Sequence, residues 1–325
     1  MAWCFLGASA QAEPPLPRLK IGDPAPPLAV SKWLRGAPMS RFEGGTVYVL
    51  DFWAVWCGPC LSAMPHTSEL ADRFRDERVR VIALTGPDNA GNTLEAVERT
   101  LSRRGGMMRF DVAWDEPLAP GTPAHLDVLL GRTTVRYFED AQLEGLPKAA
   151  IVDRQGRLAW VGLPSAMEVP LTAIVEGRWD LKAEAARDTS RRLAEPKVDE
   201  LRAMLDEGRY ADADALARAL IVGPLAGEAG YLRHLATLLA RDRKRGAARD
   251  LDLALYAAER AADLTSLADD TVLVALARVH FVRGDVEAAV AAQEAALTLM
   301  DTPIPRQAEI LETYRQALAA DRARR

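Results

Sequence analysis

Two of the three cysteines of this chain stand three positions apart, in the CGPC motif at residues 57–60. The apolar, β-branched run 46–52 before them predicts a buried strand. The residues after them predict a helix over about 60–75, interrupted by Pro65. The first cysteine would then lie at a helix N-terminus, where the helix dipole favours thiolate over thiol. A thiolate is the nucleophile of thiol–disulfide exchange, so the motif predicts redox chemistry.

Each position of the motif suits that chemistry. Cys57 is the expected nucleophile, and Cys60 can reach back to resolve a mixed disulfide. Gly58 permits the tight turn, and Pro59 stiffens the start of the helix. The alternative is half of a zinc site, but the remaining Cys4 is remote and the four histidines have no paired spacing. We therefore expect a redox pair, and neither a metal nor another cofactor.

One carboxylate falls inside the apolar strand before the motif. Asp51 follows Val47-Tyr48-Val49-Leu50, so its side chain is expected to be largely buried. Burial of a carboxylate is costly unless the group is paired or used in chemistry. Asp51 is therefore either a proton acceptor or a hydrogen-bonded structural residue. Of the two nearby tryptophans, Trp53 is expected in the core and Trp56 at the rim of the cysteine site.

The remaining elements of the first part alternate between strands and helices. Further strands are predicted over 79–84, 110–114, 149–152 and 157–161, and helices over 93–103, within 125–137 and over 167–177. The last two strands form a hairpin around the turn 153–156. This order predicts an α/β fold, a mixed sheet with helices on both faces.

The segment 51–60, DFWAVWCGPC, resembles the active-site segment of thioredoxins. Other positions that match the family are Pro65, Leu146-Pro147, Gly156 and Gly162. The lead-in 21–26 and an insertion of about 55 residues before Leu146 resemble the TlpA-like, or redoxin, branch. The resemblance covers about residues 19–180.

This resemblance implies a thioredoxin-like fold and roles for several residues. Asp51 would accept the proton of the resolving cysteine, and Trp56 would border the site. Leu146 and Pro147 would form the cis-proline step that faces the cysteines. Lys148 departs from the family, which usually has threonine there. The implied partners are a disulfide-containing protein substrate and an upstream dithiol electron donor.

Composition changes sharply near residue 182. All seven tryptophans and 16 of the 20 prolines precede it, whereas residues 183–325 contain 35 alanines and 6 glycines. Helical hairpins are predicted over 198–222 and 270–300, the second turned by Gly284. Their small residues resemble tetratricopeptide units. This all-α region is either a protein-docking array or a plain helical domain packed on the first.

The first twelve residues are short and apolar, and they end in Ala10-Gln11-Ala12. They are either a truncated signal peptide or a disordered start, because an A-x-A site is present but a basic n-region is not. We therefore divide the chain into 1–12, a thioredoxin-like domain at 13–182 and a tetratricopeptide-like domain at 183–325. The expected location is the periplasm or another exported compartment, with the cytoplasm as the alternative.

Bulk properties exclude two classes of partner. The net charge is −5, so a basic footprint for nucleic acid is not expected. The sequence has no apolar run of the roughly 18 residues that span a membrane. We predict a thiol–disulfide oxidoreductase, acting as a reductase of protein disulfides. The alternative is a protein-interaction scaffold in which the helical array is the working part and the redox pair is auxiliary.

Overall fold

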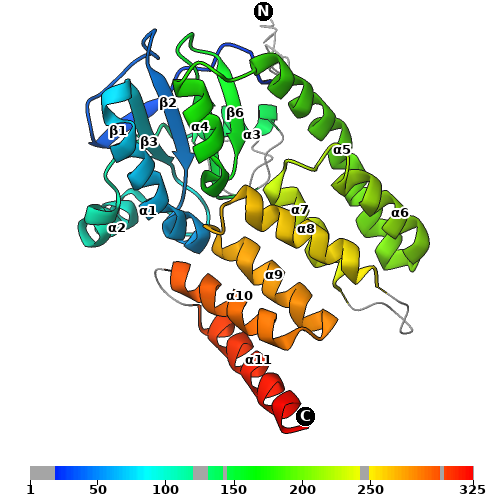
Figure 1. The fold of residues 1–325 in the computed structure, drawn as a ribbon. Coiled ribbons are helices and arrows are strands. Elements are labelled where there is room, and N and C mark those ends of the chain that lie inside the picture. The colour runs from blue at the N-terminus through cyan, green and yellow to red at the C-terminus, as the bar shows by residue number, and fades with distance from the viewer. Residues whose placement is uncertain (1–18, 120–130, 142–144, 242–248, 301–303, 325) are drawn as a thin grey trace, which may run out of the picture.

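The computed structural model describes residues 19–119, 131–141, 145–241, 249–300 and 304–324. The leader expected at residues 1–12 lies outside this part of the chain, as does the beginning of the helical segment expected over 125–137. Within the described residues the chain forms a sheet with flanking helices, followed by a series of helices (Figure 1).

A six-stranded mixed sheet forms the first part. Its strands are β1 (Val30–Arg35), β2 (Val47–Phe52), β3 (Val79–Thr85), β4 (Asp111–Asp115), β5 (Lys148–Val152) and β6 (Leu158–Gly162), in the order β1-β4-β3-β2-β5-β6. The strands β2, β3 and β4 run parallel, and β5, β6 and β1 are antiparallel to their neighbours. All six residues of β2 are buried, as expected for a central strand covered on both faces.

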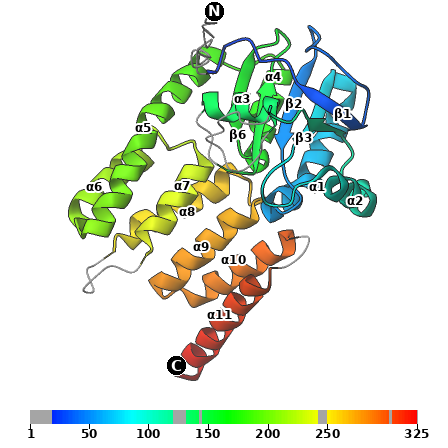
Figure 2. The ribbon, with the colours of Figure 1, turned by 180° about the vertical axis from the view of Figure 1, so that it is seen from behind.

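Helices cover both faces of this sheet. They are α1 (Gly58–Arg73), α2 (Leu94–Arg104), α3 (Arg132–Ala141) and α4 (Glu168–Val175). Residues of α1, α2 and α4 pack with one side of β2 (Figures 1 and 2). Residues of α3 pack with the other side, together with the start of α5 (Leu181–Glu207). The predicted thioredoxin-like arrangement, a mixed sheet between two helical layers, is confirmed.

Two features of this part differ from the sequence-based expectation. Helix α1 continues through Pro65 instead of being interrupted there. A proline removes one backbone hydrogen bond, but the buried side chains Met64 and Leu70 hold both halves of the helix against the core. Strand β1 was not predicted, because it lies at the end of a proline-rich lead-in and at the edge of the sheet, where its register against β4 is irregular.

The second part is helical throughout its described residues. Its helices are α5 (Leu181–Glu207), α6 (Tyr210–Ile221), α7 (Ala229–Leu239), α8 (Leu251–Leu264), α9 (Asp270–Arg283), α10 (Val286–Leu299) and α11 (Pro305–Arg324). From α7 onward each helix packs against the next (Figure 1). Gly284 ends α9 with a φ of 87°, a left-handed conformation that glycine adopts without strain, and so turns the α9–α10 hairpin. The predicted α/β region followed by an all-α region is confirmed.

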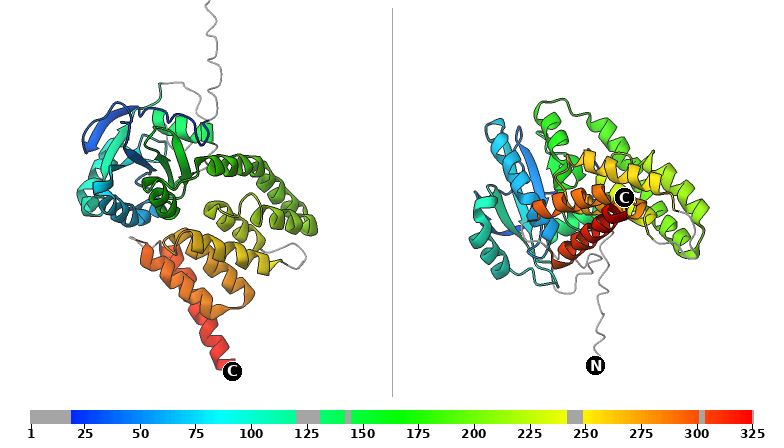
Figure 3. Two further views of the ribbon diagram at one scale, coloured as in Figure 1. Left: turned by 45° about the horizontal axis from the view of Figure 1, so that its top comes forward. Right: turned by 60° about the horizontal axis from the view of Figure 1, so that its bottom comes forward.

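The helical part meets the sheet part at the N-terminus of α9. The Ser62 hydroxyl on α1 donates to Asp270 at 3.3 Å. The Ser165 hydroxyl, in the short helical turn Pro164–Ala166, donates to Asp269 at 2.8 Å. Figure 3 shows the two parts side by side. Since α1 begins next to the CGPC motif, this contact brings the helical part to the end of the sheet that carries the cysteines.

Candidate active site

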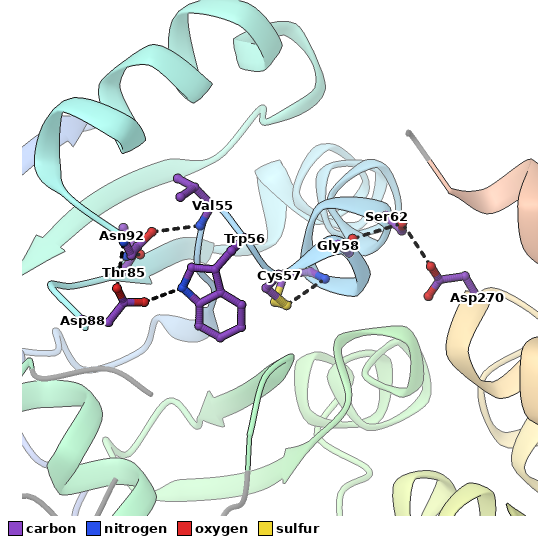
Figure 4. Close-up of a disulfide and its surroundings, with 10 residues drawn as sticks. Val55, Trp56, Cys57, Gly58, Ser62, Thr85, Asp88, Asn92 and Asp270 are labelled. Carbon is purple, nitrogen blue, oxygen red and sulfur yellow. Dashed lines mark hydrogen bonds between the residues drawn. A yellow bond between two sulfur atoms is a disulfide. The ribbon is translucent and has the colours of Figure 1, made fainter. Parts of the chain in front are cut away.

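The cysteines lie at the start of helix α1, just after the loop that follows strand β2. Cys57 is the N-cap of α1, and Pro59 occupies its first turn. Cys57 and Cys60 form a disulfide, and the backbone N–H of Cys60 donates to Cys57 Sγ at 3.2 Å (Figure 4). The nucleophile therefore sits at the positive end of a 16-residue helix. Both cysteines are almost fully buried, with 3% and 2% of their surfaces exposed.

The cis-proline step lies beside this disulfide. The Leu146–Pro147 peptide bond is cis, as predicted. Strand β5 runs antiparallel to β2, with Lys148 opposite Phe52. The two residues before Lys148 therefore come alongside the loop that follows Phe52, and Leu146 packs against the cluster that contains both cysteines.

Asp51 lies under the active-site helix. Its side chain is 3% exposed and accepts a hydrogen bond from the Thr67 hydroxyl of α1 at 3.1 Å. Burial raises the pKa of Asp51 from 3.8 to about 7, and the Thr67 hydrogen bond opposes that rise. Alternation along β2 directs Asp51 to the same side as Val49, which packs in the cysteine cluster. A carboxyl group with a pKa near neutrality can take up and release protons at physiological pH.

The two tryptophans of the motif occupy different environments, as predicted. Trp53 is fully buried, whereas 43% of Trp56 is exposed beside the disulfide. The indole N–H of Trp56 donates to the carboxylate of Asp88, which lies in the loop after β3 (Figure 4). Gly58 has open space around its α-carbon, so the start of α1 is not crowded by other residues.

The loop after β3 also holds the backbone of the active-site loop. The side-chain oxygen of Asn92 accepts from the N–H of Val55 at 2.8 Å. Its amide nitrogen donates to Thr85 Oγ1 at 2.8 Å and to the carbonyl of Gly86 at 2.6 Å. Asn92 is 1% exposed. Sequence reasoning missed Thr67, Asp88 and Asn92 because their contacts are long-range; the turn-rich run 86–92 indicated a loop but not what it touches.

Replacing Asn92 by alanine is expected to lower the free energy of unfolding by about 2 kcal/mol. The change removes the partner of the half-buried N–H of Val55 and a buried partner of the Gly86 carbonyl, and such a loss costs about 1–3 kcal/mol. Urea denaturation of the oxidised protein measures the difference. The exposed neighbour Asn89 provides the control, because its replacement by alanine should change stability by less than about 0.5 kcal/mol. Equal values for both variants would contradict the proposed support.

Other kinds of site find no support in the described part of the chain. Groups of three or more histidine, cysteine or acidic side chains that could hold a metal ion are absent from the described residues. Of the helices described, none is long and apolar enough to cross a membrane.

Comparisons with known proteins agree with this geometry. Residues 21–161 match the AhpC/TSA family. Protein FixW of Rhizobium leguminosarum is 27% identical over 168 residues, which cover 50% of this chain and 68% of FixW. The thiol-disulfide oxidoreductase ResA of Bacillus thuringiensis (strain Al Hakam) is 33% identical over 101 residues, which cover 30% of this chain and 54% of ResA. The match thus spans only about half the length of that relative.

Among solved structures, a thiol-disulfide isomerase from Corynebacterium glutamicum is 22% identical and aligns over 48% of this chain and 97% of its own, with a TM-score of 0.37. The family match begins before β1 and ends in β6, so it includes residues of all six strands and the CGPC motif. The expected resemblance to redoxin-type thiol–disulfide oxidoreductases is confirmed: residues 21–161, the part of the chain that matches the AhpC/TSA family, contain the thioredoxin-like sheet and the CGPC motif.

Proposed function

We propose that the chain is a thiol–disulfide oxidoreductase that reduces disulfides of proteins through Cys57 and Cys60. The observation that carries the proposal is the disulfide at the N-terminus of α1, next to the Leu146–Pro147 step. The ResA relatives, which are thiol-disulfide oxidoreductases by name, support the same class of reaction. They do not favour the alternative of a scaffold with an auxiliary redox pair.

The proposed reaction has two exchange steps. The Cys57 thiolate attacks one sulfur of the substrate disulfide, forms a mixed disulfide and releases the other substrate sulfur as a thiolate. Cys60 then gives its proton to Asp51 and attacks Sγ of Cys57. This step forms the Cys57–Cys60 disulfide and releases the second substrate thiolate, so two electrons pass to the substrate. An upstream dithiol donor returns the pair to the reduced state.

The other residues around the cysteines are proposed to guide the substrate. Trp56 and the Leu146–Pro147 step border the disulfide, and Gly58 and Pro59 set the turn between the cysteines. These positions would hold an extended substrate segment over Cys57. Trp56 is suited to such contact, because a large part of its ring is exposed.

Two measurements on the full chain test the proposed function. Catalysed reduction of insulin disulfides by dithiothreitol should be present, and it should be absent for a variant with both active-site cysteines changed to serine. Equilibration with glutathione buffers should give a reduction potential closer to the value of about −270 mV for thioredoxin than to about −120 mV for strongly oxidising dithiol proteins. A potential near the second value would mean that the protein oxidises its partners.

We further propose that the protein is exported and matures near Glu13. The proposal rests on the A-x-A pattern at residues 10–12 and on the ability of a dithiol reductase to serve an oxidising compartment. Intact-mass analysis of protein from its native host tests it. A retained Met1 together with a cytosolic fraction would contradict export.

The helical part is proposed to be a tetratricopeptide-like docking surface joined to the redox domain near residue 182. Its support is the α9–α10 hairpin turned by Gly284 and the small buried residues Ala277, Ala289 and Ala296 between those helices. Calorimetry of the full chain should give two unfolding transitions. Reduction of the disulfide should shift only one of them if residues 13–182 and 183–325 fold as separate units.

A further inference from the structure

A cleft with a volume of about 840 Å³ lies between the two parts of the molecule. The sheet part contributes Lys148 and residues of β6, of the turn after it and of α4. The helical part contributes residues of α5, of the loop before α7 and of the end of α8. In Figure 1 these segments face one another, with β6 and α4 on one side and α5, α7 and α8 on the other. The volume falls in the range of about 300–1,000 Å³ that small-molecule sites occupy.

The cleft contains a lysine for which the described residues provide no partner. Lys148 is partly buried, and its ammonium makes no hydrogen bond or ion pair in the described part of the chain. Burial and the nearby Arg191 lower the pKa of Lys148 to about 8, so at neutral pH the group is still mainly charged. Buried charged groups in proteins are usually paired with an opposite charge, and Lys148 departs from this rule within the described residues.

The neighbouring cation is already engaged. Arg191, also in the lining of the cleft, bonds to Asp188 and to Glu195 at 3.1 Å, and lies 4.0 Å from Glu228. Glu195 additionally accepts from the Tyr231 hydroxyl. Glu195 and Glu228 attract Lys148 only from a distance. Asp188 and Glu195 are therefore hydrogen-bonded to Arg191 and Tyr231, while Glu228, which also lines the cleft, lies nearest to Arg191. None of the three forms an ion pair with the Lys148 ammonium, which is left to interact with a ligand in the cleft.

The wall of the cleft that carries Lys148 is otherwise mainly apolar, whereas the wall formed by the helical part carries both basic and acidic side chains. Trp160, Val161 and Leu163 line the Lys148 wall from β6 and the residue after it, and Val169 and Pro170 line it from α4. Val169 is 71% exposed, an unusual environment for a β-branched apolar side chain on a helix. The sheet part thus offers the Lys148 ammonium, and beside it apolar surface that a ligand could remove from water.

We propose that this cleft binds a small organic carboxylate with an apolar body. The carboxylate pairs with Lys148, and the body lies against Leu163 and Val169. The site is separate from the proposed disulfide exchange. Alternation along β5 directs Lys148 away from the cysteine side of the sheet, toward the face on which Ala150 packs.

Calorimetric titration of the oxidised full chain with two matched probes tests the site. Indole-3-acetate and indole-3-acetamide share the same ring and differ in the carboxylate. We expect one molecule of the acid to bind per chain, at least 10-fold more tightly than the amide. Acetate, which has the charge without the ring, should bind at least 10-fold more weakly than indole-3-acetate.

Variants assign the binding to the cleft. Lys148→Met should lower the affinity for the acid to that for the amide. The control is Lys197→Met, at an exposed position on α5, which should leave the affinities for the acid and the amide unchanged. Val169→Asp places a negative charge at an exposed position of the cleft, so it should weaken binding of the acid more than binding of the amide. This variant tests the site independently if Lys148→Met disturbs folding. Equal affinities for acid and amide, or an acid affinity that survives both cleft variants, would overturn the proposal. Insulin reduction is measured separately, so a negative result for the ligand site does not contradict the proposed redox function, and the reverse also holds.

Discussion

Replacing Cys57 by serine is expected to reduce disulfide exchange to the uncatalysed rate. The N-terminus of α1 stabilises a thiolate at this position, but a serine hydroxyl remains protonated at neutral pH and cannot attack a disulfide sulfur. Cys60 cannot take over the attack, because it lies inside the first turn of the helix and not at its N-cap. Insulin reduction by the Cys57→Ser variant, compared with the wild type, measures the loss.

The matched variant, Cys60→Ser, is expected to give a different result. Cys57 remains able to attack, but the mixed disulfide has no internal thiol to resolve it. Covalent complexes with substrate proteins should therefore accumulate with Cys60→Ser and be absent with Cys57→Ser. Non-reducing electrophoresis followed by mass spectrometry identifies them. The reverse pattern, with complexes formed by Cys57→Ser, would show that the nucleophile and the resolving cysteine have been assigned the wrong way round.

The parts of the fold that sequence predicts well are those governed by local patterns. The buried strand β2 and the strands of the β5–β6 hairpin are continuous apolar runs bounded by turn residues. Their positions therefore follow from the local sequence pattern. The CGPC motif itself predicts thiol–disulfide exchange. The strand before it and the helix after it predict that the cysteines lie at a helix N-terminus. The helical second part follows from its high alanine and low glycine content.

Long-range contacts are what the sequence does not predict. Nothing near Asn92 in the chain indicates that its side chain binds the backbone of Val55, 37 positions away. The pairing of Ser165 with Asp269 joins residues 104 positions apart. The unpaired charge of Lys148 depends on how α5 and α7 close over β5. Such features arise when distant elements pack, so a pattern read along the chain contains no signal for them.

Asp51 has the largest expected effect among residues other than the cysteines. Asp51→Asn keeps the size of the side chain and still accepts the Thr67 hydrogen bond, but it cannot take a proton from Cys60. A positioned acid–base group contributes about 100-fold to 10,000-fold. Resolution of the mixed disulfide should therefore slow by at least about 100-fold, whereas attack by Cys57 should change little because the helix N-terminus already favours its thiolate.

The pH dependence of resolution separates a chemical role of Asp51 from a structural one. Because burial raises its pKa to about 7, Asp51 is protonated below that pH and cannot accept the Cys60 proton. The wild-type rate should rise with pH through about 7 and then level off, and Asp51→Asn should lose this inflection. Stopped-flow kinetics from a preformed mixed disulfide measures both. A variant that keeps the wild-type rate and pH profile would leave Asp51 a purely structural residue.

The same carboxyl group should make stability depend on pH in the opposite sense to a salt-bridged aspartate. Between pH about 4 and 7 the unfolded chain ionises Asp51 while the folded protein keeps the proton. The folded state therefore binds more protons, and its free energy of unfolding falls as pH rises. With 1.36 kcal/mol for each unit of pKa, the rise from 3.8 to about 7 corresponds to a loss of about 4 kcal/mol that is complete above pH 7.

Asp51→Asn removes this dependence, but it also buries an amide NH₂ group with two donors, and the one Thr67 hydroxyl cannot satisfy both, so the change has a pH-independent cost of about 1–3 kcal/mol. The variant should consequently be less stable than the wild type at pH 4 and more stable at pH 8. Urea denaturation of the oxidised proteins at the two pH values measures the crossing. Thr67→Val supplies an independent check. Loss of the Thr67 hydrogen bond to the carboxylate should raise the pKa of Asp51 further. The inflection in the pH profile of the resolution rate should therefore move to higher pH than in the wild type. An inflection that stays in place would mean that Asp51 does not set it.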